Sequence, residues 1–271
     1  MAGSGEEVSA RGNREETRTA LRHALVTGGA GDIGAAIGRR LAADGFHVTL
    51  LDRRDGSEGD RVCDAVAKAA GVPRERVAYA RADVTDREAV DRVVASPPRL
   101  DVAIANAGVV FSAPFLEITE EQWRAQLDVN LTGAFHTAQA AAARMVREGM
   151  PGLLLFTGSW VGSVPWPEIT AYATSKAGLE MLARQAAREL APHGIRANVV
   201  APGIVRAGMA RRQLETEPQY AARAARVVPL GELQTAEQVA GAVSFLCSPD
   251  AAYMTGSTLL IDGGASLFAF D

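Results

Sequence analysis

Cysteine is scarce in this chain of 271 residues, which contains only Cys63 and Cys247. Two cysteines far apart in the sequence cannot make a disulfide framework. Both stand in apolar, helix-like patterns, so we predict buried free thiols, with a bridge or a nucleophile as less favoured alternatives. The four histidines are scattered without metal-ligand spacing, and we therefore predict no metal site.

An excess of basic charge and a long apolar run are also missing. The net charge is −4, which gives no reason to expect nucleic acid or an anionic membrane surface as a partner. No apolar run approaches the length of a membrane span, and the first residues lack the apolar core of a secretory signal. We therefore predict a cytoplasmic protein whose partners are small molecules and other copies of itself.

The chain divides into a short tail and one domain. Residues 1–20 are rich in Gly, Ser, Glu and Arg and cannot bury enough surface to offset their ordering entropy, so we predict a flexible tail. Residues 21–271 contain no internal repeat and no Pro/Gly-rich linker. Their length suits one large α/β domain with a well-buried core.

Short aliphatic runs alternate with amphipathic stretches along this domain. The runs predict strands over Ala24–Thr27, Phe46–Leu51, Val77–Ala80, Val102–Ala105, Leu153–Phe156, Ala197–Ala201 and Thr258–Ile261. The stretches predict helices over Ala35–Asp44, Asp60–Ala70, Arg87–Ala95, Glu120–Glu148, Tyr172–Ala191 and Glu237–Cys247. Such alternation is typical of a Rossmann-type fold, a doubly wound and mainly parallel seven-stranded sheet with helices on both faces. Ligands of such a sheet lie outside the carboxyl ends of its strands.

A glycine-rich turn follows the first predicted strand and opens a helix. It reads Thr27-Gly28-Gly29-Ala30-Gly31-Asp32-Ile33-Gly34. Glycines permit a tight turn and let the backbone approach a pyrophosphate, and the helix N-terminus offers free N–H groups to the phosphates. We predict dinucleotide contacts at Gly28, Gly31, Asp32, Ile33 and Gly34; the alternative is a plain glycine-rich loop.

Asp52 ends the second predicted strand, where a carboxylate can accept hydrogen bonds from both adenosine ribose hydroxyls. A 2′-phosphate would meet a like charge there, so Asp52 favours NAD over NADP. Arg53 lies beside it in the predicted cofactor site, and Arg53 and Arg54 could instead neutralise a phosphate. A solvated loop carboxylate is the other interpretation of Asp52.

Two further strand ends carry residues suited to the nucleotide. Asp83 and Val84 can bracket an adenine with an acceptor and an apolar wall. Asn106, Ala107 and Gly108 offer small side chains where a bulky one would collide with the cofactor. Ordinary turn chemistry is the alternative for either group.

Tyr172 and Lys176 stand four residues apart on a strongly helical stretch, hence on one face. A lysine ammonium near a phenol favours the phenolate, so we expect Lys176 to lower the pKa of Tyr172 towards neutrality. Such a tyrosine is a usable general acid–base. Ser159 ends the fifth predicted strand, and its hydroxyl can hold a substrate oxygen or merely cap a loop.

Taken together, these motifs resemble the ordered set of the short-chain dehydrogenases/reductases, over roughly Leu21 to Ala265. The residues that carry the resemblance are Thr27–Gly34, Asp83, Asn106-Ala107-Gly108, Asn130, Ser159, Tyr172, Lys176 and Pro202-Gly203. Each motif is weak alone, whereas their joint spacing is highly specific.

The resemblance implies a catalytic tetrad of Asn130, Ser159, Tyr172 and Lys176. Tyr172 would exchange a proton with the substrate oxygen while hydride moves to or from nicotinamide, and Ser159 would orient that oxygen. Lys176 would also bind the nicotinamide ribose, and Tyr172 would contact the cofactor too. Asn130 would hold a water molecule that links Lys176 to solvent. Pro202, Gly203 and Val205 would wall the nicotinamide. The resemblance also implies a homo-oligomer, usually a tetramer, built on the helices of Asn130 and Tyr172.

The sequence departs from the family pattern at two positions. Asp32 stands where the family usually has glycine; it can cap the helix, and we expect its charge to turn aside from the pyrophosphate. Ala207 stands where a threonine often bonds the carboxamide, which puts that contact in doubt.

The substrate is less determined than the reaction. Trp160, Val161 and Trp166, with Ser159, are candidates for an apolar or sugar-stacking wall, although the tryptophans could simply pack their loop. Residues Arg206–Arg226 occupy the place of the family's mobile substrate lid. We predict NAD(H)-dependent interconversion of a secondary alcohol, such as a sugar, polyol or cyclic alcohol, and its carbonyl. The alternatives are a 3-oxoacyl-thioester reductase and a catalytically silent dinucleotide-binding regulator.

Overall fold

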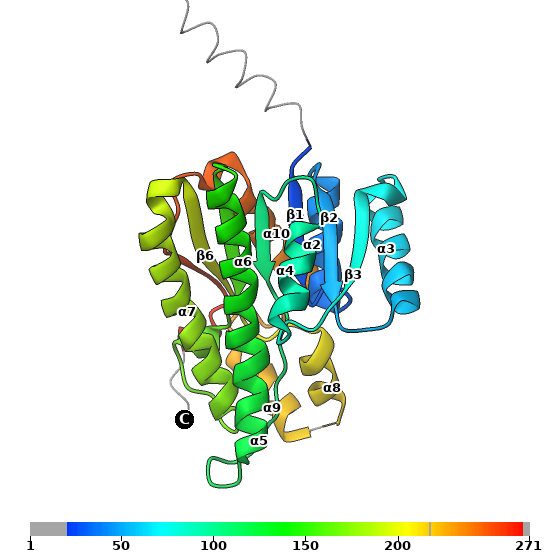
Figure 1. Cartoon of the computed structure of the whole chain (residues 1–271). Coiled ribbons are helices and arrows are strands. Elements are labelled where there is room, and N and C mark those ends of the chain that lie inside the picture. The colour runs from blue at the N-terminus through cyan, green and yellow to red at the C-terminus, as the bar shows by residue number, and fades with distance from the viewer. Residues whose placement is uncertain (1–20, 217, 268–271) are drawn as a thin grey trace, which may run out of the picture.

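A seven-stranded parallel sheet forms the centre of the protein, whose computed structural model describes residues 21–216 and 218–267 (Figure 1). The strand order is β3-β2-β1-β4-β5-β6-β7, and every neighbouring pair is parallel. The strands are β1 (His23–Thr27), β2 (His47–Asp52), β3 (Val77–Arg81), β4 (Val102–Ala105), β5 (Gly152–Thr157), β6 (Ile195–Pro202) and β7 (Thr258–Ile261). The predicted fold class is confirmed, and each predicted strand lies within two residues of its observed bounds. The tail predicted over residues 1–20 lies outside the described residues.

Helices cover both faces of this sheet (Figure 1). They are α2 (Asp32–Ala43), α3 (Gly56–Ala70), α4 (Arg87–Ala95), α5 (Glu120–Leu127), α6 (Gly133–Arg147), α7 (Thr170–Leu190), α8 (Gly208–Thr216), α9 (Pro218–Val227) and α10 (Ala236–Cys247). Apolar side chains of α2, α3 and α10 pack on one face, and those of α4, α6 and α7 on the other. The segment predicted as a lid forms α8 and α9, which lie below the carboxyl edge of the sheet in Figure 1.

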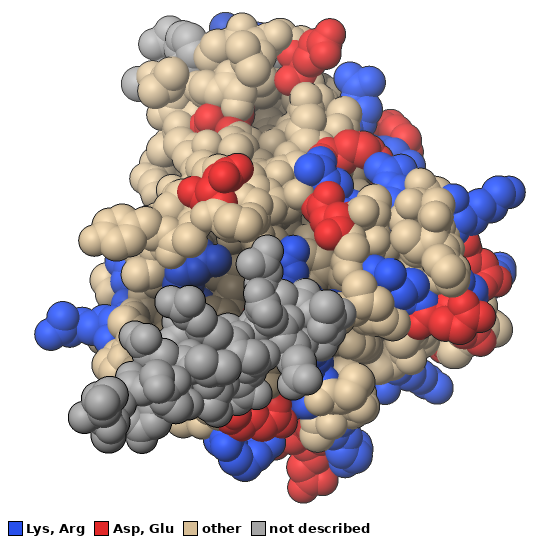
Figure 2. Space-filling model, turned by 90° about the horizontal axis from the view of Figure 1, so that it is seen from above, with Lys and Arg blue, Asp and Glu red and all other residues tan. Residues whose placement is uncertain are grey.

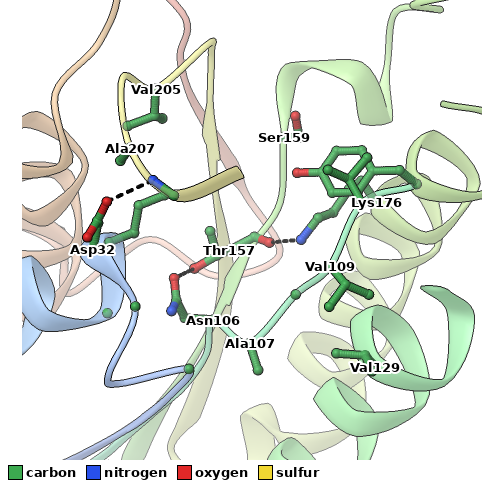
Figure 3. A pocket seen from close by; sticks show the side chains of 18 of the residues that line it. Asp32, Asn106, Ala107, Val109, Val129, Thr157, Ser159, Lys176, Val205 and Ala207 are labelled. Atoms are coloured by element: carbon green, nitrogen blue, oxygen red, sulfur yellow. Dashed lines mark hydrogen bonds between the residues drawn. The ribbon is translucent and has the colours of Figure 1, made fainter. Parts of the chain in front are cut away.

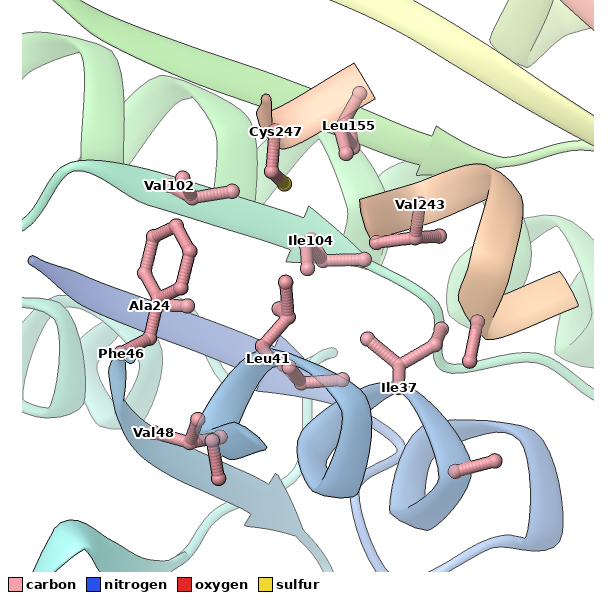
Figure 4. Close-up of a cluster of buried hydrophobic side chains, with 14 of the residues drawn as sticks. Ala24, Ile37, Leu41, Phe46, Val48, Val102, Ile104, Leu155, Val243 and Cys247 are labelled. Carbon is pink, nitrogen blue, oxygen red and sulfur yellow. The ribbon is translucent and has the colours of Figure 1, made fainter. Parts of the chain in front are cut away.

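The core explains why the strands read as continuous apolar runs. All five residues of β1 are buried, because helices cover the sheet on both sides. Ile37 and Leu41 of α2 and Val243 of α10 pack against Val48 and Ile104 on one face (Figure 4). Each fully buried aliphatic side chain of this size contributes roughly 1.5–3 kcal/mol relative to exposure. The amphipathic pattern of the helices therefore fixes which of their faces meets the sheet.

Both cysteines are buried free thiols, as predicted. Burial raises the pKa of Cys63 to about 11 and that of Cys247 to about 12. Both sulfurs are therefore held as neutral thiols at physiological pH. Within residues 21–216 and 218–267, no cluster of His, Cys, Asp or Glu has the makings of a metal site, and no helix is long and apolar enough to cross a membrane.

One predicted helix is interrupted. The sequence predicts a continuous helix over Glu120–Glu148, but residues Asp128–Thr132 form a π-helical turn between α5 and α6. The backbone of Val109 binds both ends of the Asn130 amide, which draws this turn towards the loop after β4. Because that partner is distant in sequence, helical periodicity alone cannot reveal the π-turn.

The chain order reverses between β1 and β4, which are neighbours in the sheet. From β1 the chain winds outward through β2 and β3, and from β4 it winds outward the other way. The turns that leave β1 and β4 therefore diverge to opposite faces and open a crevice at the carboxyl edge. A Cβ on Gly28 would lie 2.9 Å from the Cα of Ala107, so the two turns touch at the base of this crevice.

The opposite, amino edge of the sheet carries mixed charges. Figure 2 views the molecule from the top of Figure 1 and shows acidic and basic side chains interspersed on the described part of that face. One such pair, Arg40–Asp44 at the C-terminal end of α2, joins neighbouring turns of that helix. Exposed pairs of this kind each stabilise a helix by only a few tenths of a kcal/mol.

A buried histidine at the start of β1 predicts acid sensitivity of the fold. His23 contacts Thr49 Oγ1 through Nε2 at 2.8 Å and stacks on His47, with ring centres 6.0 Å apart. Burial and the neighbouring His47 lower the pKa of His23 to about 4. Between pH 6.5 and 4 the unfolded chain therefore binds this proton and the folded chain does not, so stability falls as the pH falls. The loss by pH 4 should be roughly 2–3 kcal/mol.

Melting temperatures between pH 7 and pH 5 will check this expectation. In His23→Gln, which retains a polar partner for Thr49, acidification should lower the melting temperature less than in the wild type. His193→Gln, at an exposed position, is the matched control and should keep the wild-type pH dependence. Equal pH slopes in all three proteins would contradict the assignment to His23.

Candidate active site

A cavity of about 500 Å³ lies at the carboxyl edge and extends from the glycine turn after β1 to Tyr172 on α7. It receives residues from the ends of β1 to β6. Figure 3 shows its stretch from Asp32 to Lys176. The sequence-predicted residues that line it are Gly28, Gly31, Asp32, Ile33, Gly34, Asp52, Arg53, Asp83, Val84, Asn106, Ala107, Gly108, Ser159, Trp160, Val161, Trp166, Tyr172, Lys176, Gly203 and Val205. Asn130 and Pro202 do not line it. The structure thus brings nearly the whole predicted site together, although which ligand each residue binds stays a prediction.

The glycine turn is too tight for side chains at Gly28, Gly29 and Gly34. Gly28 has a φ of +66°, in the left-handed region that favours glycine. A Cβ on Gly34 would lie 2.1 Å from the carbonyl oxygen of Gly28, which no other residue could accommodate without moving the turn. Gly31 is the N-cap of α2 and has no side chain to satisfy the helix N–H groups. The first turn of α2 can therefore offer these N–H groups to an anion.

Asp32 does not cap α2, which corrects that expectation. Its Oδ2, drawn in Figure 3, accepts a hydrogen bond from the backbone N–H of Gly208 at 2.8 Å. The same carboxylate pairs with the guanidinium of Arg211. Asp32 is the first residue of the helix rather than its cap, so its side chain reaches the start of α8 instead of the N–H groups of its own turn. This aspartate therefore ties the glycine turn to the predicted lid.

Asp52 is anchored at the rim of the cavity. Its Oδ2 accepts from the N–H of Ala30 at 3.1 Å and its Oδ1 from the N–H of Arg54 at 3.3 Å. The side chain is only 12% exposed, so it is not a freely solvated loop carboxylate. Arg54 pairs with Glu58 at 2.6 Å, whereas Arg53 is exposed beside the cavity. Asp52 therefore holds the glycine turn and still borders the cavity.

Asp83 shows the turn chemistry that was the alternative interpretation. Its Oδ1 accepts from both the N–H and the hydroxyl of Thr85, at 2.9 and 2.8 Å. Asp83 and Val84 nevertheless both line the cavity. Asp83 can stabilise the turn and also bind a ligand in the cavity, since a carboxylate accepts more than two hydrogen bonds.

Asn106 is held between two strand ends by threonines that sequence analysis did not single out. Its Nδ2 donates to Thr27 O at 2.9 Å, and its Oδ1 accepts from the hydroxyl of Thr157 at 3.2 Å (Figure 3). Thr27 Oγ1 also accepts the N–H of Asn106 at 3.0 Å. Their position in the sequence could have indicated this role, because Thr27 and Thr157 are the last residues of β1 and β5 and so lie at the carboxyl edge.

Tyr172, Ser159 and Lys176 converge at the far end of the cavity. A hydrogen bond joins the side chains of Ser159 and Tyr172. Lys176 Nζ lies 5.3 Å from the centre of the Tyr172 ring and donates to Thr157 O at 2.7 Å (Figure 3). Lys176 is 3% exposed, so its ammonium is held by backbone rather than by water.

Burial controls the titration of this pair. It raises the pKa of Tyr172, and the hydrogen bond from Ser159 opposes that shift. It also lowers the pKa of Lys176 to about 8. The expectation that Lys176 brings the pKa of Tyr172 down towards neutrality is therefore wrong for this arrangement, because a low-dielectric site disfavours both charged forms.

Asn130 stands behind the cavity wall. It is fully buried in the π-turn, where Oδ1 accepts from the N–H of Val109 at 2.8 Å and Nδ2 donates to Val109 O at 2.9 Å. A Cβ on Gly108 would lie 3.3 Å from Asn130 Oδ1 and 3.8 Å from Lys176 Nζ. Asn130 therefore fixes the loop beside Lys176, while the predicted water link stays a prediction.

The loop after β6 closes the cavity opposite α7. A Cβ on Gly203 would lie 2.8 Å from the Cα of Asp262, so this glycine permits close packing against the segment after β7. Val205 and Ala207 are buried and line the cavity. Pro202 is the last residue of β6 and is buried beneath this wall, which explains why it does not line the cavity.

The two tryptophans both pack their loop and line the cavity, so the two interpretations do not exclude each other. Trp160 and Trp166 meet edge to face with ring centres 5.1 Å apart. Tyr220 of α9 meets Trp166 in the same way at 6.4 Å, and the Arg223 guanidinium lies 5.7 Å from the centre of the Trp166 ring. This aromatic cluster connects the loop after β5 to the predicted lid.

Comparison with known proteins agrees with this geometry. A family profile described as enoyl-(acyl carrier protein) reductase matches residues 28–266. The chain is 34% identical to 3beta-hydroxysteroid dehydrogenase 1 of Eggerthella lenta, covering 90% of this chain and 93% of that protein. It is 38% identical to the 3-oxoacyl-[acyl-carrier-protein] reductase MabA of Mycobacterium tuberculosis, covering 91% and 93%.

A solved structure of an Agrobacterium tumefaciens protein with bound NADP is similar at a TM-score of 0.83 and 30% identity, covering 91% of this chain and 97% of that one. The match extends over nearly the whole fold and includes the site. The chain therefore belongs to the short-chain dehydrogenase/reductase family, whose members are nicotinamide-dinucleotide oxidoreductases acting on CH–OH groups.

Proposed function

We propose that this enzyme interconverts a secondary alcohol and its ketone with NAD(H), using Tyr172 as the acid–base. The observation that supports the proposal is the convergence of Tyr172, Ser159 and Lys176 at one end of a cavity whose other end reaches Asp52. The residues fit a dinucleotide: a glycine turn that side chains would fill, a helix N-terminus without a side-chain cap, and a fixed carboxylate. When bound, the nicotinamide supplies or takes up the hydride.

The chain's own residues handle the substrate oxygen and its proton. The Ser159 hydroxyl holds the oxygen beside the Tyr172 hydroxyl, with which it shares a hydrogen bond. In oxidation the Tyr172 phenolate removes the hydroxyl proton, and in reduction the phenol returns it. Lys176 stabilises the phenolate electrostatically, and Thr157 O and the loop fixed by Asn130 hold Lys176 in place.

Asp52 supports NAD as the preferred coenzyme. Its carboxylate is fixed by two backbone N–H groups at the cavity rim, where a ribose hydroxyl can donate to it and a phosphate would be repelled. Arg54 pairs with Glu58 and lies 3.9 Å from Asp52, which leaves exposed Arg53 as a cation available to a 2′-phosphate. A related structure does hold NADP, so the coenzyme has to be measured.

Steady-state oxidation of secondary alcohols with NAD and with NADP tests the proposal. Formation of reduced nicotinamide should require a secondary alcohol and be faster with NAD. Tight binding of NADH without turnover of any alcohol or ketone would favour a silent dinucleotide-binding regulator instead. Turnover with NADP alone would overturn the role given to Asp52.

A second candidate is reduction of 3-oxoacyl thioesters. The similarity to MabA at 38% identity favours it. Reduction of a 3-oxoacyl N-acetylcysteamine thioester at least about tenfold more efficient than that of any simple ketone, together with NADPH preference, would select this reaction.

We also propose that the enzyme is a homo-oligomer. Phe135 and Val146 on α6 and Met181 on α7 are 39%, 37% and 55% exposed, an arrangement that suits contact with a second copy of the chain. Sedimentation equilibrium will report the assembly, and a monomer at micromolar concentration would exclude it.

A further inference from the structure

We propose that the substrate is an uncharged and largely apolar ketone or secondary alcohol, and not a sugar, a polyol or an anion. This inference rests on the proposed function and narrows its substrate class. The chemistry common to the candidates is an apolar ring system or acyl chain attached to the reacting carbon. It follows from the way charged and apolar side chains are divided between the two ends of the cavity.

The charged residues that line the cavity gather at its nucleotide end. They are Asp32, Asp52, Arg53, Arg54 and Asp83. At the reacting end the described lining is Val110, Trp160, Val161, Trp166, Ile169 and Tyr220, around Ser159 and Tyr172. Among the described residues that line this end, the one charged side chain is Lys176, and Thr157 O already binds its ammonium. The guanidinium of Arg223 lies over the Trp166 ring but does not line the cavity. A carboxylate or phosphate on the substrate would therefore meet no uncommitted cation among the described lining residues.

The side chains of this apolar wall are held in place by their mutual packing. Trp160, Val161 and Trp166 are no more than 8% exposed, and Trp160 and Trp166 fix each other edge to face. The ring of Tyr220 extends the same wall onto α9, and its hydroxyl is one polar group within that wall. Flat, rigid aromatic faces suit a ring or an extended chain, because these give large contact area at little entropic cost.

Hydroxyl groups distinguish a polyol from such a substrate. Ser159 and Tyr172 together serve one oxygen, the one that reacts. Each further hydroxyl buried against Val110, Val161 or Ile169 would lose its water without a side-chain acceptor, which costs roughly 5- to 100-fold in affinity. Apolar surface in the same place gains affinity as it leaves water. The lining therefore selects against the sugar and polyol part of the proposed substrate range.

The loop that follows the lining residue Val110 carries further apolar side chains. The N–H of Ala113 donates to Glu168 O at 2.8 Å, which joins the loop after Val110 to the loop before α7. On the first loop, Phe111, Phe115 and Leu116 are 43%, 72% and 93% exposed. The exposed carboxylate of Glu168 further disfavours an anion.

Paired substrates test the inference. With the coenzyme-saturated enzyme, oxidation of the bicyclic alcohol decahydro-2-naphthol should have a kcat/KM at least about 100-fold above that of xylitol. Ile169→Asn, which places an amide in the wall, should reduce this ratio at least about tenfold. Tyr253→Asn, at a fully exposed position, is the control and should leave the ratio unchanged. The kcat/KM for reduction of a 3-oxodecanoyl N-acetylcysteamine thioester, compared with that of 2-decalone, shows whether the apolar part of the substrate is an acyl chain or a carbocycle.

Calorimetric binding to the enzyme–NADH complex separates this inference from the proposed reaction. 2-Decalone should bind at least about tenfold more tightly than xylulose. If decalone shows this preferential binding but no alcohol or ketone is turned over, the proposed reaction is wrong and the inference of an apolar substrate site is retained. Preference for the polyol in binding or in kcat/KM, or no decalone binding at millimolar concentration, would overturn the inference.

Discussion

Replacing Tyr172 by phenylalanine is expected to lower kcat by about 10³-fold, which is the usual contribution of a positioned acid–base. The phenol is the group placed to exchange a proton with an oxygen held by Ser159, with which it shares a hydrogen bond. Phenylalanine keeps the ring and its packing in the aromatic cluster, so coenzyme affinity should stay within about threefold of wild type. Stopped-flow turnover and NADH titration measure the two quantities separately.

Tyr220→Phe is the matched control, because it also removes a phenolic hydroxyl from the cavity lining. Tyr220 lies on the outer wall against Trp166, so its loss should change kcat far less than the loss at Tyr172. A Tyr172→Phe enzyme that retains a tenth or more of wild-type kcat would remove Tyr172 from the acid–base role, whatever the control shows.

The pH dependence follows from the direction of the Tyr172 pKa. Burial raises that pKa, so the phenolate needed for oxidation is a minor species at neutral pH. Alcohol oxidation should therefore accelerate by up to about tenfold per pH unit as the pH rises, and ketone reduction should slow once the pH passes the pKa. The Tyr172→Phe enzyme should lose this dependence. An oxidation rate that is flat between neutral and alkaline pH would show that another group supplies the base.

Sequence could predict the site because a parallel sheet sorts residues by position. Asp52 ends β2, and Asn106 and Ser159 follow β4 and β5, so their strands alone carry them to one edge. The Tyr172–Lys176 spacing needs only a helix to become one face. These inferences use local patterns of strands and helices, which the alternation of apolar runs and amphipathic stretches reveals in this sequence.

Other features depend on contacts between distant parts of the chain. The π-turn at Asn130 depends on hydrogen bonds to the backbone of Val109. Asp32 is bound by Gly208 and Arg211, which are 176 and 179 residues away. The pKa of Tyr172 was misjudged for a similar reason. A four-residue spacing reveals the neighbouring lysine but not the burial that outweighs it.

Replacing Asp52 by asparagine is expected to shift the coenzyme preference towards NADP. The carboxylate offers charged acceptors at the cavity rim, and a hydrogen bond to a charged partner is worth about 10- to 100-fold. Asparagine keeps the shape and one acceptor oxygen but removes the charge. The kcat/KM with NAD should therefore fall about 10- to 100-fold, and the efficiency with NADP should rise because its phosphate no longer meets a like charge.

The ratio of the two efficiencies, rather than either value alone, isolates the effect of charge. Asp52 also accepts the N–H of Ala30 and so holds the glycine turn, and a loosened turn would weaken both coenzymes alike. Asp55→Asn is the matched control, since Asp55 caps α3 through the N–H of Glu58 at 3.0 Å and does not line the cavity. That variant should keep a capped α3, because asparagine and aspartate are equally good N-caps, and should keep the wild-type ratio. An Asp52→Asn enzyme with an unchanged ratio would show that this carboxylate supports the turn without selecting the coenzyme.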